Sequence, residues 1–247
     1  MRSDLGRSFG NAVEDYVRGR PGWPIEAVDA PGIAPDAHVL DLAAGTGKLT
    51  ELLARRFARV TAVEPDDEMR AANRWGDVLA GTAEAIPLPD EAVGAVFVAE
   101  AFHWFCDPPA LRELERVLEP RGTLVLLWNR PRGSLADLVR VHELMERLRN
   151  EVGVSSKVHR FYSGEWRSVF ANSGFGRIEE VELEHEHVLD REGLVAYFMS
   201  QSQVAARSPD DRQAIRAELE RLIPPGRHVR TLLAMVYWAR LVAEPDD

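Results

Sequence analysis

Residues 39–50 decide the fold of this chain, and they read Val39-Leu40-Asp41-Leu42-Ala43-Ala44-Gly45-Thr46-Gly47-Lys48-Leu49-Thr50. The pattern is typical of a buried strand that runs through a glycine turn into a helix. Glu64 follows Gly47 by 17 residues and ends a second apolar run, Val60–Val63. In α/β nucleotide sites an acid at that position binds a ribose. The segment therefore predicts a nucleotide-type site at the end of two parallel strands.

The residue types of this turn suit a polar ligand. At Gly45 and Gly47 the missing side chains let a ligand approach the backbone, and the following helix offers free N–H groups. Asp41 is placed to accept a hydrogen bond from an amino group, and Glu64 to accept from both hydroxyls of a ribose. The structural alternative is a strand–turn–helix that needs glycine only for its geometry.

One class of nucleotide is disfavoured by the same segment. A dinucleotide fingerprint has a third glycine, and Thr50 stands in its place. An acid, Asp41, also precedes the glycines. Both features count against an NAD-linked oxidoreductase.

Short apolar runs alternate with helical patterns from residue 36 to 130, which indicates a parallel sheet covered on both faces. The strands are expected at His38–Leu42, Arg59–Glu64, Val78–Thr82, Val93–Ala99 and Thr123–Trp128, and the helices at Lys48–Phe57, Asp67–Trp75 and Pro109–Leu118. Further on, helices are expected at Ser134–Asn150, Ser163–Ser173 with Ser163 as its N-cap, Arg191–Gln203 and Asp210–Leu222, and strands at Arg177–Val188 and Thr231–Leu241.

Composition excludes several classes of protein. The net charge of −10 over 247 residues argues against a nucleic-acid binder, which needs a basic face. The single cysteine, Cys106, excludes a disulfide framework and a thiolate metal cluster, and no metal site is expected. No apolar run approaches the ~20 residues of a membrane span, and the N-terminus lacks an apolar signal segment. The sequence thus predicts a soluble cytoplasmic protein.

Taken together, these motifs resemble the class I S-adenosylmethionine-dependent methyltransferases. The acid-x-x-x-Gly-x-Gly spacing of Asp41–Gly47 resembles their first motif. The chain is most similar to the small-molecule branch that contains the ubiquinone-biosynthesis and trans-aconitate methyltransferases. The segments that carry this resemblance are Asp41–Gly47, Val63-Glu64-Pro65, Gly81–Pro89, Phe102–Phe105, Arg116–Gly122, Phe9-Gly10, Tyr16, Arg18–Pro24 and Tyr237–Arg240.

The resemblance implies a fold and a cofactor. The fold is an α/β, Rossmann-like, doubly wound sheet of seven strands, mostly parallel, with an antiparallel last strand and helical lid insertions. The cofactor is S-adenosyl-L-methionine. The residues that would bind it are Asp41, Ala43, Gly45, Gly47, Glu64, Pro65, Ala83 and Glu84 at the adenine edge, Ala99 at the end of the fourth strand, and Tyr16 and Arg20 in an N-terminal lid. For Arg20 a solvated leader helix is an equal alternative.

His103 is the candidate general base, because it comes just after the fourth strand at the ligand-binding edge of the sheet. The alternative is that His103 and Trp104 only pack under the lid. Glu100 is a weaker candidate for a polar contact. His159–Tyr162 are candidates to line an acceptor pocket, with packing as the alternative. Departures from the family pattern fall at Glu100, Cys106 and Arg121, on the substrate side.

The sequence thus predicts one methyltransferase domain over residues 1–247, with a lid at 1–35, a cofactor-binding core at 36–130 and substrate-side insertions at 131–247. Its acceptor would be a small molecule attacked at oxygen or carbon, with no nucleic acid and no membrane span. The rivals are a non-catalytic protein that binds S-adenosylmethionine in regulation or assembly, an NAD-linked oxidoreductase, and a nucleic-acid methyltransferase. A nucleic-acid methyltransferase would have an Asn-Pro-Pro-aromatic motif after the fourth strand, where this chain has Glu100–Trp104. No pattern indicates an oligomeric state.

Overall fold

The computed structural model describes residues 13–133, 138–152 and 163–242. The Cα trace divides into two compact units. The sheet unit comprises residues 23–130, 156–183 and 233–247, and the helical unit comprises residues 1–22, 131–155 and 184–232. The prediction that residues 1–247 form one domain with the three parts given above stays a prediction.

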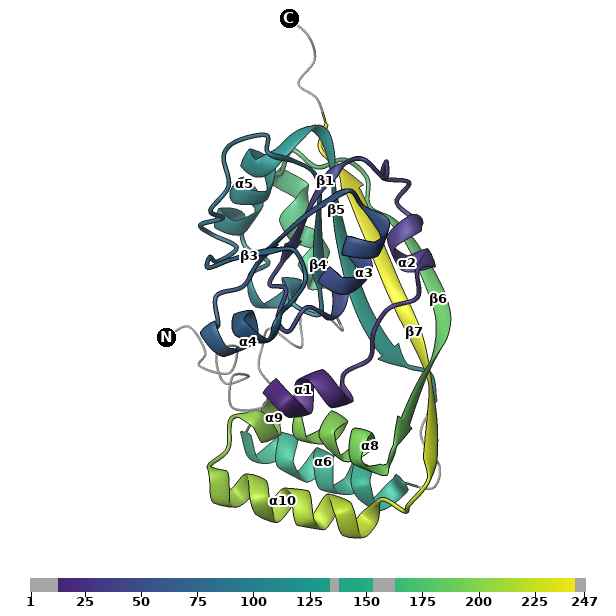
Figure 1. Ribbon diagram of the computed structural model, residues 1–247. Coiled ribbons are helices and arrows are strands. Elements are labelled where there is room, and N and C mark those ends of the chain that lie inside the picture. Colours follow the sequence, from purple (N-terminus) through teal and green to yellow (C-terminus); the bar gives the residue numbers. More distant parts are fainter. Residues whose placement is uncertain (1–12, 134–137, 153–162, 243–247) are drawn as a thin grey trace, which may run out of the picture. The chain divides into compact units, whose positions relative to one another are not determined.

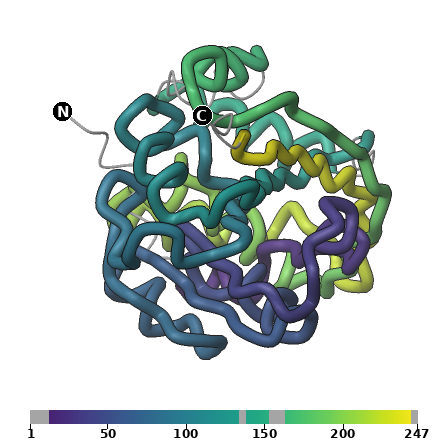
Figure 2. Tube along the Cα trace, turned by 90° about the horizontal axis from the view of Figure 1, so that it is seen from above, coloured from purple at the N-terminus to yellow at the C-terminus, as the bar shows by residue number. Residues whose placement is uncertain are grey.

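Seven strands form one sheet in the order β3-β2-β1-β4-β5-β7-β6. The strands β3, β2, β1, β4 and β5 are parallel to one another. The last strand, β7, runs against β5, because Leu241 donates to Gly122 while Arg132 donates to Thr231. The predicted fold class is therefore confirmed. The strands are β1 (His38–Leu42), β2 (Arg59–Val63), β3 (Asp77–Leu79), β4 (Val93–Ala99), β5 (Leu118–Pro131), β6 (Glu179–Asp190) and β7 (Arg227–Arg240), with β7 yellow in Figure 2.

Helices cover both faces of this sheet, as the alternating side chains of β1 require. Leu40 and Leu42 belong to the same core cluster as Leu114 of α5. Val39, which precedes Leu40 and points to the other face, joins Leu53 of α3 in the cluster there. Figure 1 shows α3 and α5 on opposite sides of the sheet. The helices of the sheet unit are α2 (Glu26–Asp29), α3 (Lys48–Arg56), α4 (Asp67–Ala72) and α5 (Pro108–Val117), with short 3₁₀ helices at Phe102–Trp104 and Glu165–Asn172.

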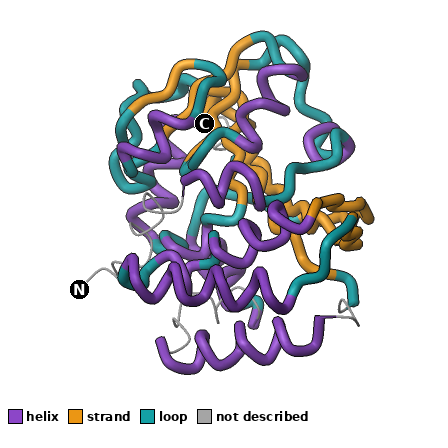
Figure 3. The backbone as a smooth tube through the Cα atoms, turned by 60° about the horizontal axis from the view of Figure 1, so that its bottom comes forward, coloured by secondary structure: helices purple, strands orange, loops and turns teal. Residues whose placement is uncertain are grey.

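The helical unit has its own apolar core. The predicted apolar face of the 134–150 segment is buried there, with Val141, Leu144 and Leu148 among its members. Their partners come from the neighbouring helices, which Figure 3 shows in purple, and include Leu194 and Leu219. The helices are α1 (Val13–Gly19), α6 (Val139–Val152), α8 (Arg191–Met199), α9 (Ser202–Ala205) and α10 (Pro209–Leu222).

Several predicted elements are wrong in their limits or type. The helix expected at 67–75 ends at Ala72, the fifth strand spans Leu118–Pro131 rather than Thr123–Trp128, and the last strand begins at Arg227 rather than Thr231. The third strand ends at Leu79, not Thr82, because Thr82 and Ala85 pair with each other in a tight turn. The segment after Ser163 is a 3₁₀ helix whose N-cap is Gly164 in the left-handed conformation, with no side-chain cap. The helix expected at 191–203 ends at Met199 and a second begins at Ser202. Within the described ranges, no helix is long and apolar enough to cross a membrane.

Candidate functional site

A tight turn at the carboxyl end of β1 forms the centre of the site. Ala43, Gly45 and Gly47 have φ values of 60°, 55° and 88°, in the left-handed region. The turn is tied to the end of β2 by the Ala44 N–H, which donates to the Val63 carbonyl at 3.1 Å. A non-glycine residue in this conformation is strained, and such strain concentrates at functional sites.

The two glycines serve different purposes. A Cβ atom built on Gly47 would lie 2.3 Å from Oδ1 of Asn73, so Gly47 is required for the packing of the turn against the end of α4. A Cβ atom built on Gly45 would meet nothing within 4 Å. The space above Gly45 is therefore open, as a ligand that lies against the backbone requires.

Glu64 closes the turn from the side of β2. Its Oε2 accepts a hydrogen bond from the Gly45 N–H at 2.8 Å, and its Oε1 accepts from the Asp66 N–H at 2.9 Å. Each carboxylate oxygen has a second lone pair, so both oxygens can still accept from hydroxyl groups of a ligand. Burial raises the pKa of Glu64, and the two N–H donors oppose that rise.

Asp41 lies under the same turn and is almost fully buried, at 1% exposure. Its Oδ2 accepts from the Thr50 hydroxyl at 2.6 Å, and Asn73 in turn donates to that hydroxyl at 3.0 Å. Its Oδ1 has no hydrogen-bond partner among the described residues. Burial raises the pKa of Asp41 to about 7, the Thr50 hydroxyl opposes this rise, and the charge of Glu64 adds to it.

An unpartnered buried oxygen on an acid indicates a missing donor. The Thr46 hydroxyl, within the turn, is also buried and has no partner in the described part of the chain. A ligand with an ammonium group for Asp41 and a diol for Glu64 would supply donors to these two acceptors. A diphosphate does not, because it would bring negative charge beside two carboxylates.

The loop 81–90, which carries the predicted adenine contacts, is fixed to α5. Arg116 donates to the carbonyls of Ile86 and Leu88 at 3.0 and 2.8 Å, and Glu113 accepts from the Ile86 N–H at 3.0 Å. The hydrogen bond to Arg116 lowers the pKa of Glu113. Ala83 is buried and Glu84 is partly exposed in this loop, whereas Pro65, after β2, is exposed.

The end of β4 carries the third predicted group. Glu100, which follows Ala99, has a φ of 56° and accepts from the Asn129 N–H at 2.7 Å. His103 is buried, at 9% exposure, in the 3₁₀ helix that follows. The indole N–H of Trp128 donates to Nδ1 of His103 at 3.4 Å. In the neutral ring the proton is then on Nε2, so this nitrogen is a hydrogen-bond donor.

The sheet unit brings most of the predicted residues to one edge of its sheet. Glu64 accepts from the Gly45 N–H of the turn, and Asp41 accepts from Thr50 of α3, the helix that follows the turn. Tyr16 and Arg20 belong to the helical unit, where Arg20 donates to the Ser200 hydroxyl and carbonyl, both at 2.9 Å. Phe9, Gly10 and the 159–162 cluster lie outside the described residues.

Sequence reasoning missed three side chains that hold the site in shape. These are Thr50, Asn73 and Arg116, and each acts through hydrogen bonds to residues distant in sequence. The role of Thr50 could have been suspected from the sequence, since it lies one helical turn after the glycines. Asn73 and Arg116 carried none, because their partners are known only from the fold.

Comparisons with known proteins agree with this geometry. A methyltransferase-domain family model matches residues 40–126. An uncharacterized methyltransferase-like protein of Schizosaccharomyces pombe is 31% identical over 225 residues, 87% of this chain and 86% of that protein. An uncharacterized methyltransferase of Mycobacterium tuberculosis is 51% identical over 132 residues, so the match spans about half of each chain (52% and 54%). The structure of a candidate type II methyltransferase from Anaeromyxobacter dehalogenans shares the fold, with a TM-score of 0.67, 24% identity and coverage of 91% and 99%.

Proposed function

This chain belongs to the methyltransferase family, and from that premise we propose that it transfers the methyl group of S-adenosylmethionine to an oxygen or carbon atom of a small-molecule acceptor. One observation carries the proposal. The buried, unpartnered Oδ1 of Asp41 lies under a turn whose Gly45 faces open space. A nucleotide site for a cationic ligand needs this combination, and a structural turn does not.

Each part of the cofactor has a complementary group. Asp41 would accept from the amino group, and the turn Ala43–Gly47 with the N-terminus of α3 would hold the carboxylate. Glu64 would bind both ribose hydroxyls, with Pro65 beside it. Ala83, Glu84 and Ala99 would border the adenine and the methyl-bearing end. Tyr16 and Arg20 are retained as proposed lid residues.

Bound S-adenosylmethionine supplies an activated methyl group on a sulfonium, which is the reactive bond. The protein's part is to orient the acceptor for in-line attack and to exclude water. A general base is needed only when the attacking atom carries a proton at neutral pH. His103 is the residue proposed to contact the acceptor, as a hydrogen-bond donor through Nε2.

One comparison bears on whether the methyl group goes to an oxygen or to a carbon atom of the acceptor. A relative from Rubrivivax gelatinosus, named as a ubiquinone/menaquinone biosynthesis C-methyltransferase, is 36% identical over 113 residues, which cover 40% of this chain and 45% of that protein. This favours carbon. The second candidate is a non-catalytic protein that binds S-adenosylmethionine, and the intact cofactor residues support it equally. Turnover with any acceptor would separate the two.

Glu64→Ala is the test of the cofactor site. The purified protein should bind S-adenosylhomocysteine at one site by calorimetry and should not bind NADH. Loss of two hydrogen bonds from ribose hydroxyls to a carboxylate, together with a looser turn at Gly45, should weaken that binding about 100-fold or more. Glu68→Ala, an exposed acid on the adjoining helix, is the control and should bind normally. An unchanged affinity in Glu64→Ala would show that the site lies elsewhere.

His103 gives a second prediction. His103→Ala should lower turnover about 10- to 100-fold with unchanged affinity for S-adenosylhomocysteine, because the acceptor loses one oriented contact. His103→Gln retains an N–H donor near the position of Nε2 and cannot act as a base, so it should retain most of the rate. Equal loss in both variants, with a pH-dependent limb of the rate that only the wild type shows, would instead establish His103 as the base.

A further inference from the structure

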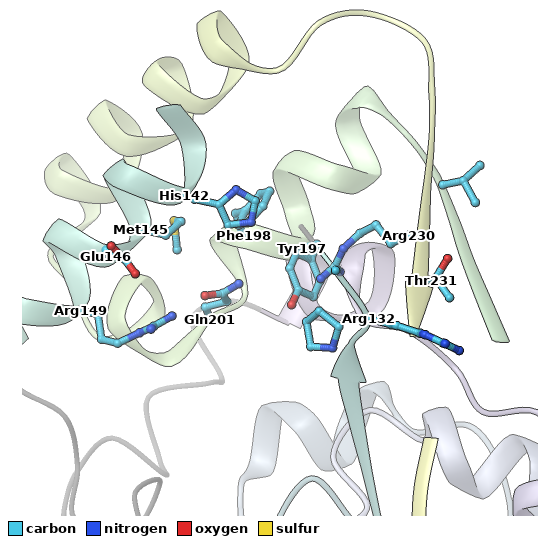
Figure 4. Close-up of a pocket in the computed structure, with 13 residues that line it drawn as sticks. Arg132, His142, Met145, Glu146, Arg149, Tyr197, Phe198, Gln201, Arg230 and Thr231 are labelled. Carbon is cyan, nitrogen blue, oxygen red and sulfur yellow. The ribbon is translucent and has the colours of Figure 1, made fainter. Parts of the chain in front are cut away.

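A cavity within the helical unit is lined by residues to which the proposed function assigns no role. Its volume is about 330 Å³, at the lower end of the range for small-molecule sites. Its wall is partly apolar, with Met145 and Phe198, and Figure 4 shows these side chains near His142, with Arg230 and Arg132 on the other side near Tyr197. The lining residues are Pro131, Arg132, Gly133, His142, Met145, Glu146, Arg149, Tyr197, Phe198, Gln201, Val229, Arg230 and Thr231.

Arg230 is the unusual member of this wall. It is only 8% exposed, and its guanidinium lies 3.8 Å from the centroid of the Tyr197 ring. Its Nη1 is buried without a hydrogen-bond partner. Within residues 13–133, 138–152 and 163–242, the side chain of Arg230 forms neither an ion pair nor a hydrogen bond. A buried guanidinium without an anion is costly, and proteins rarely keep one without a use.

The surroundings of Tyr197 increase the positive charge at this end of the cavity. Arg20 lies 5.9 Å from the same ring and is held by Ser200 rather than by an acid. Glu146 is the one acidic residue among the lining residues, against three arginines. In a chain of net charge −10, two arginines that share an aromatic ring and have no acid partner among the described residues indicate a site for an anion.

We propose that this cavity binds a small organic carboxylate, with the carboxylate on the guanidinium of Arg230 and the apolar body against Met145 and Phe198. The planar fork of arginine matches the two oxygens of a carboxylate. The stacking on Tyr197 fixes the plane of the fork and so reduces the entropy cost of binding. Arg230 lines the cavity, so a ligand within it lies beside this guanidinium. The proposal concerns binding and does not rest on methyl transfer.

The test uses three probes of matched size or charge on the full chain, by calorimetry or ligand-observed NMR. Hexanoate has the carboxylate and an apolar body, hexanamide has the same shape without the charge, and inorganic phosphate has the charge without the body. Hexanoate should bind at least tenfold more tightly than hexanamide, and phosphate should not displace it. Competition by phosphate at equal concentration would overturn the carboxylate in favour of a phosphate site.

Substitutions of Arg230 test whether this residue binds the carboxylate of hexanoate. Arg230→Met has a similar length and no charge, and it should bring the hexanoate-to-hexanamide ratio to about one. Arg132→Met removes a rim arginine that pairs with Glu184, and it should keep the tenfold ratio. Arg230→Lys keeps the charge and removes the planar fork of the guanidinium. Its hexanoate-to-hexanamide ratio should therefore lie between those of Arg230→Met and the wild type. If Arg230→Met does not fold by circular dichroism, Arg230→Lys decides alone. A ratio that Arg230→Met or Arg230→Lys leaves at the wild-type value would refute the proposal, and so would equal binding of the two probes to the wild type.

This outcome is independent of the cofactor site. Binding of S-adenosylhomocysteine is measured in the same samples, and Arg230→Met should leave it unchanged. Hexanoate binding without cofactor binding would refute the proposed function alone. Cofactor binding with no preference for hexanoate would refute the carboxylate site alone.

Discussion

Asp41→Asn should make the ligand-free protein more stable at pH 8 and at the same time abolish detectable binding of S-adenosylhomocysteine. The reason lies in the raised pKa of about 7 for this buried acid, against ~3.9 in an unfolded chain. Between these two values the folded state holds a proton that the unfolded state has lost. The free energy of unfolding therefore falls as the pH rises from about 4 to 7.

The size of this effect follows from the shift. Each pKa unit corresponds to about 1.4 kcal/mol, so an ionised Asp41 destabilises the ligand-free fold by an amount on the order of 2–4 kcal/mol. The amide of Asn carries no charge and escapes this cost. Binding is lost because an amide nitrogen or a neutral oxygen is a poor partner for the ammonium group of the ligand. For the wild type, affinity should increase from pH 6 to pH 8 as Asp41 ionises.

Thermal unfolding at pH 4, 6 and 8 checks this prediction. The midpoint of Asp41→Asn should match the wild type at pH 4 and exceed it at pH 8. The control is Asp36→Asn, which changes an exposed acid and should follow the wild type at every pH. A difference that does not vary with pH would show that Asp41 is not the titrating group.

Gly47→Ala should mainly lower stability and Gly45→Ala should mainly weaken cofactor binding, although the two residues lie only two positions apart. At Gly47 an alanine has to keep a φ of 88° and place its Cβ atom 2.3 Å from the Asn73 side chain. The strain costs about 1–2 kcal/mol and the overlap adds to it, so we expect a loss on the order of 3 kcal/mol. At Gly45 only the strain applies, and the methyl group enters the open space proposed for the cofactor.

The matched pair separates stability from binding. Gly47→Ala should lower the unfolding midpoint by about 6–12 °C, and Gly45→Ala by about 2–8 °C. Gly45→Ala should nevertheless weaken the binding of S-adenosylhomocysteine at least tenfold. The double variant Gly47→Ala/Asn73→Ala should recover part of the lost stability because the overlap is removed. If Gly45→Ala binds normally, the ligand does not lie over that residue.

Residues 38–64 and 93–99 show which parts of such a fold can be predicted from sequence. The strands His38–Leu42 and Val93–Ala99 agree residue for residue with β1 and β4, because a buried parallel strand is a continuous apolar run with sharp limits. The glycine turn was predictable for a similar reason, since few other uses require Gly at both positions. The antiparallel last strand came only from the family resemblance, and the order of the strands was not predicted.

Other features were not predictable, for identifiable physical reasons. Two features depend on packing between segments 23–32 residues apart, and no local sequence pattern predicts such packing. They are the unpartnered Oδ1 of Asp41 and the contact of Gly47 with Asn73. The hydrogen bond from Trp128 to His103 turned a sequence-based candidate base into a proposed donor. The buried state of Arg230 was also hidden, because its neighbours in sequence, His228 to Thr231, look like a polar turn.

The path of the chain through the two units bears on how the protein is made. Residues 23–130 supply β1 to β5 in one continuous stretch, whereas the helical unit combines three segments and is complete only at residue 232. The strand β7 is also the last to be synthesised, yet it lies between β5 and β6 in the sheet. During translation the ribosome therefore releases β1 to β5 early, and β6, β7 and the last segment of the helical unit late. Until then the edge of β5 is unpaired, which makes the nascent chain, rather than the folded protein, the form most exposed to aggregation.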